Sequence, residues 1–406
     1  MLFRSSSINL ATDMAYQEMV MSIVEEKRNL QPRYVVVIGI GGSNLGTIAV
    51  EEAVQGIRPK VLSGRDDEPS MPGLLYADTV DPDSLSEIIS IIEPVLQEGQ
   101  NIIIDLVSKS GTTTEPVANF QVLYELLQKY KNDAQEYVIC TTGKGSKLWD
   151  LAQAKGFSAL EIPKPVGGRY SVFSAVGIFP LALAGIDTGK LLEGAALMRD
   201  NCLNRDLKSN PAALSALMIY LLAKRGVNIL DSFLFSKDLE SAGRWYRQLL
   251  GESIGKELDN EGKQVFAGLT PTVSIGTTDL HSVGQLYLGG PYDKLTYFIS
   301  TKSSRKSLTI PAIEGFEGLV PEISGKSMDQ VMDAILDGVK AAYATKDRPF
   351  ASIILPDKSP GSIGQLLQMR MMEMMFLGKL FNVNPFDQPN VESYKIEAKK
   401  NLSGQG

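Results

Sequence analysis

Short apolar runs that alternate with amphipathic stretches constrain the fold of this chain more than any other feature. The first five runs occupy residues 33–40, 74–80, 101–110, 136–142 and 158–163. Two of the segments between them have apolar residues at helical spacing and open on an acid, Asp81 in one and Glu115 in the other. Continuously apolar runs are typical of strands that helices cover on both faces. The pattern therefore predicts an α/β domain with a parallel sheet.

A second series of the same kind follows in the later part of the chain. Its apolar runs lie at 227–236, 294–300 and 349–355, and the segment at 327–345 between the last two has the character of a helix. A length of 406 residues with 44% apolar content suits two cores of ordinary size. We therefore expect two doubly wound parallel-sheet domains with helices on both faces, and the two halves could be duplicates of one plan.

The sequence PKPVGGRYS at 163–171 interrupts the alternation with two prolines and two glycines, which favours a domain boundary there. The expected division is a first domain at 1–165, a helical connection at 166–225, a second domain at 226–380 and a C-terminal segment at 381–406.

Composition narrows the class of protein. A net charge of −7 and a pI near 5.1 disfavour nucleic acid and anionic membranes as partners. The only cysteines, Cys140 and Cys202, have no motif spacing, and the amino terminus lacks the apolar core of a signal peptide, so we expect a cytoplasmic protein. The apolar stretch at 172–186 is too short to span a bilayer, and we expect a core helix there. The Met-rich run at 364–381 predicts a buried helix.

Histidine occurs once, at His281. A metal site built on two or more histidines is therefore impossible, and metal chemistry would have to rest on carboxylates. We expect no cofactor and no metal, which favours acid–base chemistry by side chains.

Two turns rich in glycine or hydroxyl groups stand out, GIGGSNLG at 39–46 and SKSGTTTEP at 108–116. Each follows a predicted strand and leads into a predicted helix, where backbone N–H groups and the positive helix end favour an anion. In the first turn the contacts would fall to Gly41, Gly42 and Ser43. The dinucleotide fingerprint fits poorly, because Asn44 takes the place of its last glycine and no acid ends the next strand. A tight turn without a ligand stays open as the alternative.

The second turn offers five hydroxyl groups and one ammonium group, which suits the three terminal oxygens of a phosphate monoester. A helix cap alone would need one hydroxyl. The nearby GKGSK at 143–147 does not have the order of a nucleotide-triphosphate loop, and Ser146 reads more simply as a helix cap. The sequence therefore predicts a phosphate site at the second turn and disfavours hydrolysis of nucleoside triphosphates.

Three later segments carry polar groups among glycines or prolines: GESIGKE at 251–257, GTTDLHSVGQ at 276–285 and NPFDQPNVESYK at 384–395. Together with the two turns and VGGRYS, they strongly resemble, in the same order, the phosphoglucose isomerase family. The resemblance implies two sugar-isomerase (SIS) domains, a homodimer, and interconversion of glucose 6-phosphate and fructose 6-phosphate through a cis-enediol, a step of glycolysis and gluconeogenesis.

The resemblance also implies which residues contact the sugar phosphate. Phosphate contacts fall on the second turn, contacts at the sugar end fall on the first turn, and a glutamine near the C-terminus contacts the sugar. These residues are Ser108, Lys109, Ser110, Thr112 and Thr113 for the phosphate loop, Gly42 and Ser43 for the first turn, and Gln388.

Moving a carbonyl group between C1 and C2 requires one base that removes a proton from one carbon and returns it to the other. The resemblance implies that this base is Glu252; by itself, a glutamate between Gly251 and Ser253 is more typical of a solvated loop. The enediolate needs a fixed cation, which the resemblance assigns to Arg169. Without the resemblance, Arg169 would be read as a surface or interdomain ion pair.

Opening of the sugar ring needs a proton donor and acceptor, and histidine titrates near neutral pH. The resemblance assigns this step to His281 and Lys395, with His281 entering from the neighbouring subunit and Glu115 orienting it. Otherwise His281 would be structural or at the surface, and Lys395 would be one of several solvated basic residues.

Other functions stay open at this point. One is a sensor that binds a sugar phosphate on the same fold without catalysis. Another is an isomerase that also accepts mannose 6-phosphate. A nicotinamide-dependent oxidoreductase is the least supported. The expected partners are a small sugar phosphate and a second copy of the chain.

Overall fold

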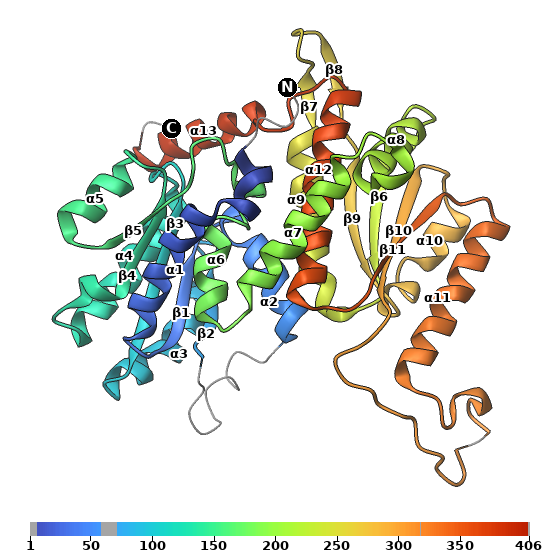
Figure 1. The fold of residues 1–406 in the computed structure, drawn as a ribbon, viewed down its shortest axis with the longest axis horizontal. Coiled ribbons are helices and arrows are strands. Elements are labelled where there is room, and N and C mark those ends of the chain that lie inside the picture. Colours follow the sequence, from blue (N-terminus) through green and yellow to red (C-terminus); the bar gives the residue numbers. More distant parts are fainter. Residues whose placement is uncertain (1–5, 58–70, 317, 405–406) are drawn as a thin grey trace. The chain divides into compact units, whose positions relative to one another are not determined.

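The structure is a computed structural model that describes residues 6–57, 71–316 and 318–404 and divides into two compact units (Figure 1). The first unit runs to Leu203 and also includes Ile363–Met371, and the second comprises the remainder. The stretch 166–203, expected within a helical connection, packs with the first unit, and the domain boundaries drawn from the sequence stay a prediction. In the described residues no helix is long and apolar enough to cross a membrane.

The first unit is built on a five-stranded parallel sheet in the order β2-β1-β3-β4-β5. Nearly every residue of its central strands is buried, as their apolar sequences predict. All five strands coincide with predicted ones. Their bounds are β1 Pro32–Ile38, β2 Gly73–Ala77, β3 Asn101–Ser108, β4 Val138–Thr142 and β5 Ser158–Glu161.

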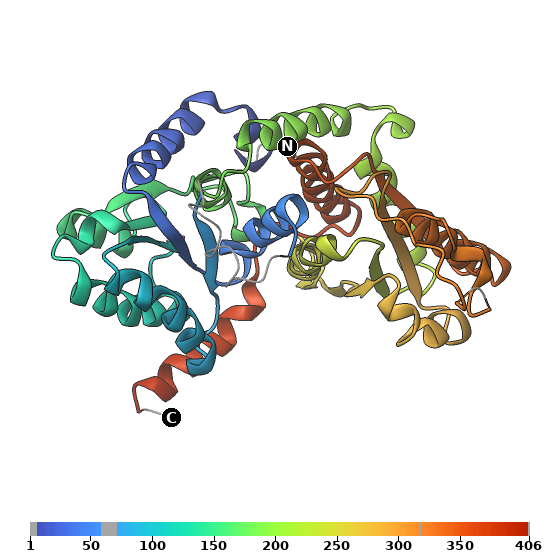
Figure 2. The ribbon, with the colours of Figure 1, turned by 90° about the horizontal axis from the view of Figure 1, so that it is seen from below.

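Helices cover both faces of this sheet, α1, α2 and α6 on one side and α3 and α4 on the other (Figure 2). Asp81 caps α3 by accepting from the amide of Asp83, and every residue of α6 is buried, which confirms the predicted core helix. The bounds are α1 Met14–Arg28, α2 Leu45–Gln55, α3 Pro82–Gln97, α4 Thr114–Tyr130, α5 Lys147–Lys155, α6 Ala175–Leu183 and α7 Thr188–Cys202.

The second unit has a four-stranded parallel sheet in the order β11-β10-β6-β9 and a short antiparallel hairpin, β7-β8. Read from the opposite edge, the order is β9-β6-β10-β11, which corresponds in chain order to β2-β1-β3-β4 of the first sheet. This correspondence is expected if the two units share one plan. The sequence patterns predict β6, β10 and β11 but miss β7, β8 and β9. The bounds are β6 Ile229–Leu234, β7 Lys256–Leu258, β8 Gln264–Ala267, β9 Thr270–Ile275, β10 Lys294–Thr301 and β11 Phe350–Leu355.

One face of the second sheet packs against α10 and α11 through aromatic side chains, with Phe298 and Tyr343 edge to face at 5.0 Å between ring centroids. Elsewhere in this unit, the buried carboxylate of Glu373 on α12 accepts from Tyr246 on α9 at 2.6 Å and also from Ser215 on α8. The Met-rich run lies in α12 and is largely buried, as predicted. The bounds are α8 Pro211–Ala223, α9 Glu240–Ile254, α10 Gly284–Gly289, α11 Met328–Thr345, α12 Pro360–Leu380 and α13 Glu392–Leu402.

Candidate active site

The two predicted anion-binding turns leave adjacent strands of the first sheet. β1 and β3 are hydrogen-bonded neighbours, and the order of the strands reverses between them because β2 lies on the outer side of β1. In open parallel sheets, ligands bind at the carboxyl edge where the strand order reverses. Topology therefore puts both turns at the position where this kind of sheet receives a ligand.

The turn after β1 is in direct backbone contact with the GGRY segment. A Cβ on Gly42 would lie 2.2 Å from the carbonyl carbon of Gly168, so only glycine fits there. The hydroxyl of Ser171 donates to the carbonyl oxygens of both glycines, at 3.1 Å to Gly42 and 2.6 Å to Gly168. The glycine turn, with Ser43, is thus fixed against the residue that precedes Arg169.

Arg169 belongs to the short helical turn Gly168–Tyr170 and is only 2% exposed, with its guanidinium 5.6 Å from the centre of the Tyr170 ring. Its burial contradicts a surface ion pair, one of the two alternatives for this residue, and leaves the interdomain ion pair untested. A guanidinium held inside the protein at this edge can stabilise negative charge on a ligand without reorganisation.

The turn after β3 is held by its own hydroxyl groups. The Ser108 and Thr113 hydroxyls are 3.0 Å apart, and both the amide and the hydroxyl of Thr112 lie 3.3 Å from the Ser110 hydroxyl. Thr113 is the N-cap of α4, but its side chain makes no capping bond. The first amides of this long helix can therefore donate to an anion.

Lys109 braces this turn. Its ammonium group donates to the carbonyl oxygens of Lys164 and Val166, both at 2.7 Å, and partial burial lowers its pKa. The lysine thereby ties the phosphate turn to the segment that leads to Arg169. A direct contact of Lys109 with the phosphate stays a prediction.

Residues at the end of the neighbouring strand β4 also hold this turn. The Thr142 hydroxyl donates to the Ser108 carbonyl at 2.6 Å, and Ser146 caps α5 by accepting from the amide of Trp149 at 3.1 Å. The interpretation of Ser146 as a cap is confirmed. Glu115 lies half-buried in the first turn of α4, as its place in the sequence predicts.

Asn44 is a feature of the first turn that the sequence reasoning missed. It precedes α2 and is buried, yet neither polar atom of its amide has a hydrogen-bond partner among the described residues. A buried amide in this state is unfavourable unless another group satisfies it. The only sign of Asn44 in the sequence was that it stands where the dinucleotide fingerprint has its last glycine.

The corresponding edge of the second sheet is closed by an internal carboxylate. Asp238, just after β6, accepts from Lys358 at 2.8 Å and pairs with Arg305, and these two cations follow β11 and β10. Lys358 also donates to the Ser236 hydroxyl at 3.1 Å. The cations at this edge thus already have an anion, which favours the first unit as the phosphate site.

In the second unit, Glu252 lies in the last turn of α9 and is partly buried, so it is not a solvated loop acid. The side-chain amide of Gln248, one turn earlier, donates to the Glu252 carboxylate at 3.3 Å. The other amide atom of Gln248, its oxygen, is buried without a partner among the described residues. Gln248 was also missed; its spacing of four residues from Glu252 on one helix was the available signal.

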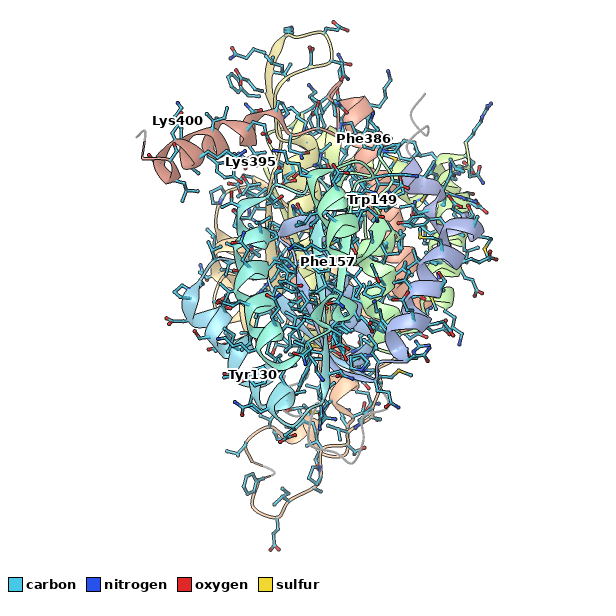
Figure 3. The ribbon with its side chains drawn as sticks, turned by 90° about the vertical axis from the view of Figure 1, so that its left-hand side faces the viewer. Tyr130, Trp149, Phe157, Phe386, Lys395 and Lys400 are labelled. Carbon is cyan, nitrogen blue, oxygen red and sulfur yellow. The ribbon has the colours of Figure 1, made fainter. Side chains whose placement is uncertain are left out.

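Lys395 lies on α13, with Phe386 towards one end of this helix and Lys400 towards the other (Figure 3). Its ammonium donates to the Glu392 carboxylate at 2.7 Å, and this bond is the main reason that the pKa of Lys395 is raised. The negative charge of Glu252 raises it further. Glu252 and Lys395 both belong to the second unit, and Gln388 is exposed ahead of α13.

His281 follows the short helical turn Thr278–Leu280 and is exposed. The loop around it is fixed by Asp279, whose carboxylate accepts from the Ile275 amide and from the Ser282 hydroxyl, both at 2.7 Å. The imidazole is thus exposed on the surface of the unit, on a loop that Asp279 holds through two hydrogen bonds.

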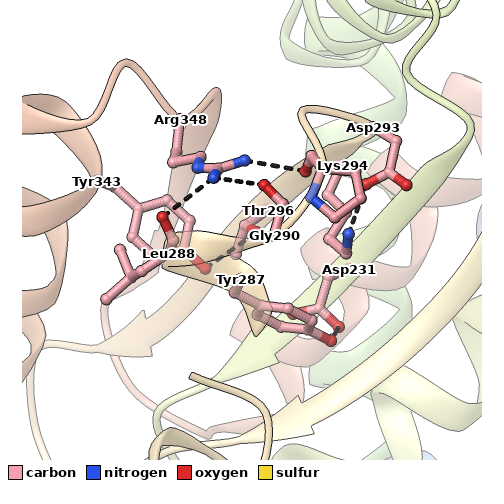
Figure 4. Close-up of polar contacts among 10 residues, drawn as sticks. Asp231, Tyr287, Leu288, Gly290, Asp293, Lys294, Thr296, Tyr343 and Arg348 are labelled. Atoms are coloured by element: carbon pink, nitrogen blue, oxygen red, sulfur yellow. Dashed lines mark hydrogen bonds and ion pairs between the residues drawn. The ribbon is translucent and has the colours of Figure 1, made fainter. Parts of the chain in front are cut away.

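The helix after this loop, α10, is fastened to the sheet by buried polar contacts (Figure 4). Tyr287 donates to the carboxylate of Asp231 on β6 at 3.1 Å, and Thr272 and Ser274 on β9 donate to the same oxygen at 2.6 and 3.0 Å. Burial raises the pKa of Asp231. The hydroxyl groups around one carboxyl group therefore define where α10 sits.

Arg348 holds the other end of α10. Its guanidinium donates to the carbonyl oxygens of Leu288, Gly290 and Pro291 at 3.0, 2.6 and 2.9 Å (Figure 4), and it stacks on Tyr292 at 3.7 Å. A cation at a helix C-terminus satisfies carbonyls that have no partner in the helix.

The predicted residues thus fall into two groups. The first unit assembles the glycine turn, the hydroxyl turn and Arg169, and the second assembles Glu252 and Lys395, with His281 on a separate loop. Within the described parts of the chain, no three His, Cys, Asp or Glu side chains are grouped to hold a metal ion.

Comparisons with known proteins identify the family of this chain. Residues 29–404 match the family described as phosphoglucose isomerase. Glucose-6-phosphate isomerases from Carboxydothermus hydrogenoformans and Methanocaldococcus jannaschii are each 34% identical to this chain and cover 89% of it, and the chain covers 77% and 82% of them.

Solved structures show the same fold. A hypothetical protein from Thermus thermophilus superposes with a TM-score of 0.85 at 31% identity, covering 98% of this chain and 90% of that one. A glucose-6-phosphate isomerase from Chlamydia trachomatis superposes with a TM-score of 0.83 at 24% identity, covering 96% and 73%. This chain belongs to the phosphoglucose isomerase family.

Proposed function

We propose that this protein interconverts glucose 6-phosphate and fructose 6-phosphate as an aldose–ketose isomerase that needs no metal. The observation that carries the proposal is the pair of glycine- and hydroxyl-rich turns at adjacent strand ends, the first of which is in backbone contact with the segment of a buried arginine, in a chain that matches the family over residues 29–404. The substrate in this proposal is taken from the names of relatives called glucose-6-phosphate isomerase.

The phosphate group binds at the turn after β3. Its oxygens accept from the hydroxyls of Ser108, Ser110, Thr112 and Thr113 and from the first amides of α4, while Lys109 stiffens the turn. The open amide groups at the start of α4 support this assignment. Gly42 and Ser43 line the sugar end, and Gln388 contacts the sugar.

Ring opening comes first, because sugar phosphates are mostly closed rings. The O1 hydroxyl loses a proton and the ring oxygen gains one as the C1–O5 bond breaks, and His281 and Lys395 exchange these protons. Glu115 orients His281. The carboxylate of Glu392 keeps Lys395 positively charged, so Lys395 can also stabilise negative charge on the ring oxygen through a hydrogen bond.

Isomerisation follows on the open chain. The Glu252 carboxylate removes the proton from C2 of glucose 6-phosphate, the electron pair moves to the C1 carbonyl oxygen, and the enediolate form of the cis-enediol results. Transfer of the O2 hydroxyl proton to O1 and return of the carbon-bound proton from Glu252 to C1 give fructose 6-phosphate. Arg169 stabilises the negative charge on the intermediate, and Gln248 holds the carboxylate through the bond at 3.3 Å.

The working molecule is a homodimer in which His281 serves the active site of the other subunit. Its exposure at the surface of its own unit, on a loop that Asp279 holds, supports this arrangement.

A coupled assay with fructose 6-phosphate in the presence of EDTA tests the function. Formation of glucose 6-phosphate at an undiminished rate supports a metal-independent isomerase. Binding of fructose 6-phosphate without any product would favour the non-catalytic sensor, and epimerisation at C2 would show that mannose 6-phosphate is also a substrate.

A further inference from the structure

Lys256 is a buried cation that none of the steps above uses. It lies two residues beyond the end of α9 and opens β7, and its side chain is 4% exposed although Gly255 and Glu257 on either side are exposed. Lysine is rarely buried unless its ammonium group has hydrogen-bonding partners. The hydrogen bonds of this ammonium group therefore indicate the structural role of Lys256.

The ammonium group of Lys256 joins two segments that are far apart in the sequence. It donates to the main-chain carbonyl of Glu252 in the last turn of α9 and, at 2.8 Å, to the main-chain carbonyl of Asp387. The Asp387 carboxylate lies 3.7 Å away. Carbonyl groups in the last turn of a helix lack partners within the helix, and a cation there is favourable.

The segment on the other side of this contact is itself ordered. The Asn384 amide donates to the Asp387 carboxylate at 2.7 Å, and the Phe386 amide donates to the Asn384 side chain at 3.1 Å. Gln388 follows directly, and α13 then carries Lys395. A displacement of Asp387 would therefore be transmitted to both residues.

Three further hydrogen bonds join the same parts of the chain, but they lie at the surface. The Asn390 side-chain amide donates to the Glu257 carboxylate at 3.2 Å. The Asn260 main-chain amide donates to the Asn382 carbonyl at 2.8 Å, and the Asn260 side-chain amide donates to the Asn382 side-chain oxygen at 3.2 Å. Water competes for exposed hydrogen bonds and weakens their hold on geometry. The buried contact through Lys256 is better suited to fix position than these exposed ones.

We propose that Lys256 is a positioning residue for the isomerisation: its ammonium group fixes the backbone at Glu252 against the segment that carries Gln388 and Lys395. The inference rests on the proposed function, in which Glu252 is the base. Lys256 does not touch the sugar; it sets where the carboxylate stands relative to the reacting carbons. A misplacement of about 1 Å in such a group can lower the rate by about 10²-fold.

The variant Lys256→Met keeps the length of the side chain and removes its donors and charge. We expect kcat for fructose 6-phosphate to fall by about 10²-fold with KM changed less than about threefold. Lys256→Arg, which can reach both carbonyls, should restore at least part of the loss. Lys263→Met is the matched control, because Lys263 is an exposed lysine of the same hairpin, and it should keep the parental kcat.

A second comparison separates positioning from a general loss of structure. In a Glu252→Gln background, Lys256→Met should lower the residual rate by less than about threefold, because the residue acts through the missing base. An equal 10²-fold loss in both backgrounds would overturn the inference. A parental kcat in Lys256→Met would overturn it too.

Hydrogen exchange gives a readout that does not depend on activity. Main-chain amides at 251–255 and 384–395 should exchange faster in Lys256→Met, and their exchange rates should not change in the control variant. Unchanged exchange at both segments in Lys256→Met would contradict the proposal. If Lys256→Met does not fold, Lys256→Gln keeps one donor group but cannot reach both carbonyls, and it should lower kcat several-fold, whereas a parental kcat there would overturn the inference. Failure of the proposed function would instead appear as an inactive parental chain.

Discussion

Asp105 is a buried carboxyl group whose ionisation opposes folding. It lies on β3 inside the first sheet, where the Thr141 hydroxyl on β4 donates to it at 2.8 Å. Burial raises the pKa of Asp105 from 3.8 to about 7. Since the pKa is higher in the folded than in the unfolded protein, the stability that this group contributes is fully present below pH ~4 and is lost as the pH rises through about 7.

The variant Asp105→Asn should remove this dependence while keeping the shape and an acceptor for Thr141. The unfolding free energy of the variant minus that of the parental protein should therefore rise from pH 4.5 to pH 8, by an amount on the order of a few kcal/mol. Thermal unfolding at the two pH values measures the change. A difference between variant and parent that stays constant across this range would contradict the raised pKa.

At the same scale, sequence reasoning predicted residue types better than their contacts. The hydroxyls of the second turn were identified because five of them exceed what a helix cap needs. By contrast, the bracing role of Lys109 depends on two carbonyls about sixty residues away along the chain, which no local pattern displays. Gln248 and Asn44 were missed because an amide on a helix or in a turn has many ordinary explanations.

Among the elements, α10 shows how a short helix can be held in place by its surroundings. Six residues are too few to form a stable helix alone. Tyr287 fastens the helix to Asp231, and Arg348 satisfies the carbonyl groups at its end (Figure 4). The loop that carries His281 leads directly into this helix, so its position depends on these contacts.

The variant Arg348→Lys should loosen α10, because an ammonium group cannot reach three carbonyls in the way that the planar guanidinium does. We expect faster amide exchange at 281–291 and a loss of about 1–3 kcal/mol in unfolding free energy. Lys346→Arg, at an exposed position nearby, is the control and should leave both quantities unchanged. Parental exchange in Arg348→Lys would show that other contacts hold the loop.

The elements of the first unit were predictable because its strands are continuously apolar and buried on both faces. β9 escaped prediction because TPTVSI contains three hydroxyl side chains and because the strand lies at the edge of its sheet. Two of these hydroxyls, those of Thr272 and Ser274, donate to Asp231. β7 and β8 are short and largely exposed, so their composition resembles that of a loop.

At the scale of the whole molecule, the proposed chemistry draws on both units. The phosphate turn and Arg169 belong to one, and Glu252, His281 and Lys395 belong to the other. Because Asp238 already pairs with Lys358 and Arg305 at the corresponding edge of the second sheet, the proposal assigns catalytic side chains, and no second phosphate site, to the second unit. How the units combine into one site is part of the proposal, as is the dimer.

A complementation experiment tests the dimer. In a mixed dimer of Glu252→Gln and His281→Asn subunits, one site would hold both defects and the other neither if His281 acts across the interface. Co-expression of the two inactive variants with different tags should therefore restore up to about a quarter of the parental activity, from half of the dimers with one of two sites intact. If His281 acts within its own subunit, each site keeps one defect and no activity returns.

The central claim is that Glu252 transfers the proton between the two carbons of a sugar held by the phosphate turn, and the most direct test is kcat for fructose 6-phosphate in the variant Glu252→Gln. We predict a fall of about 10³-fold with little change in the affinity for the sugar phosphate, while Glu257→Gln, an exposed neighbour, keeps the parental rate. Parental turnover in Glu252→Gln would contradict the account.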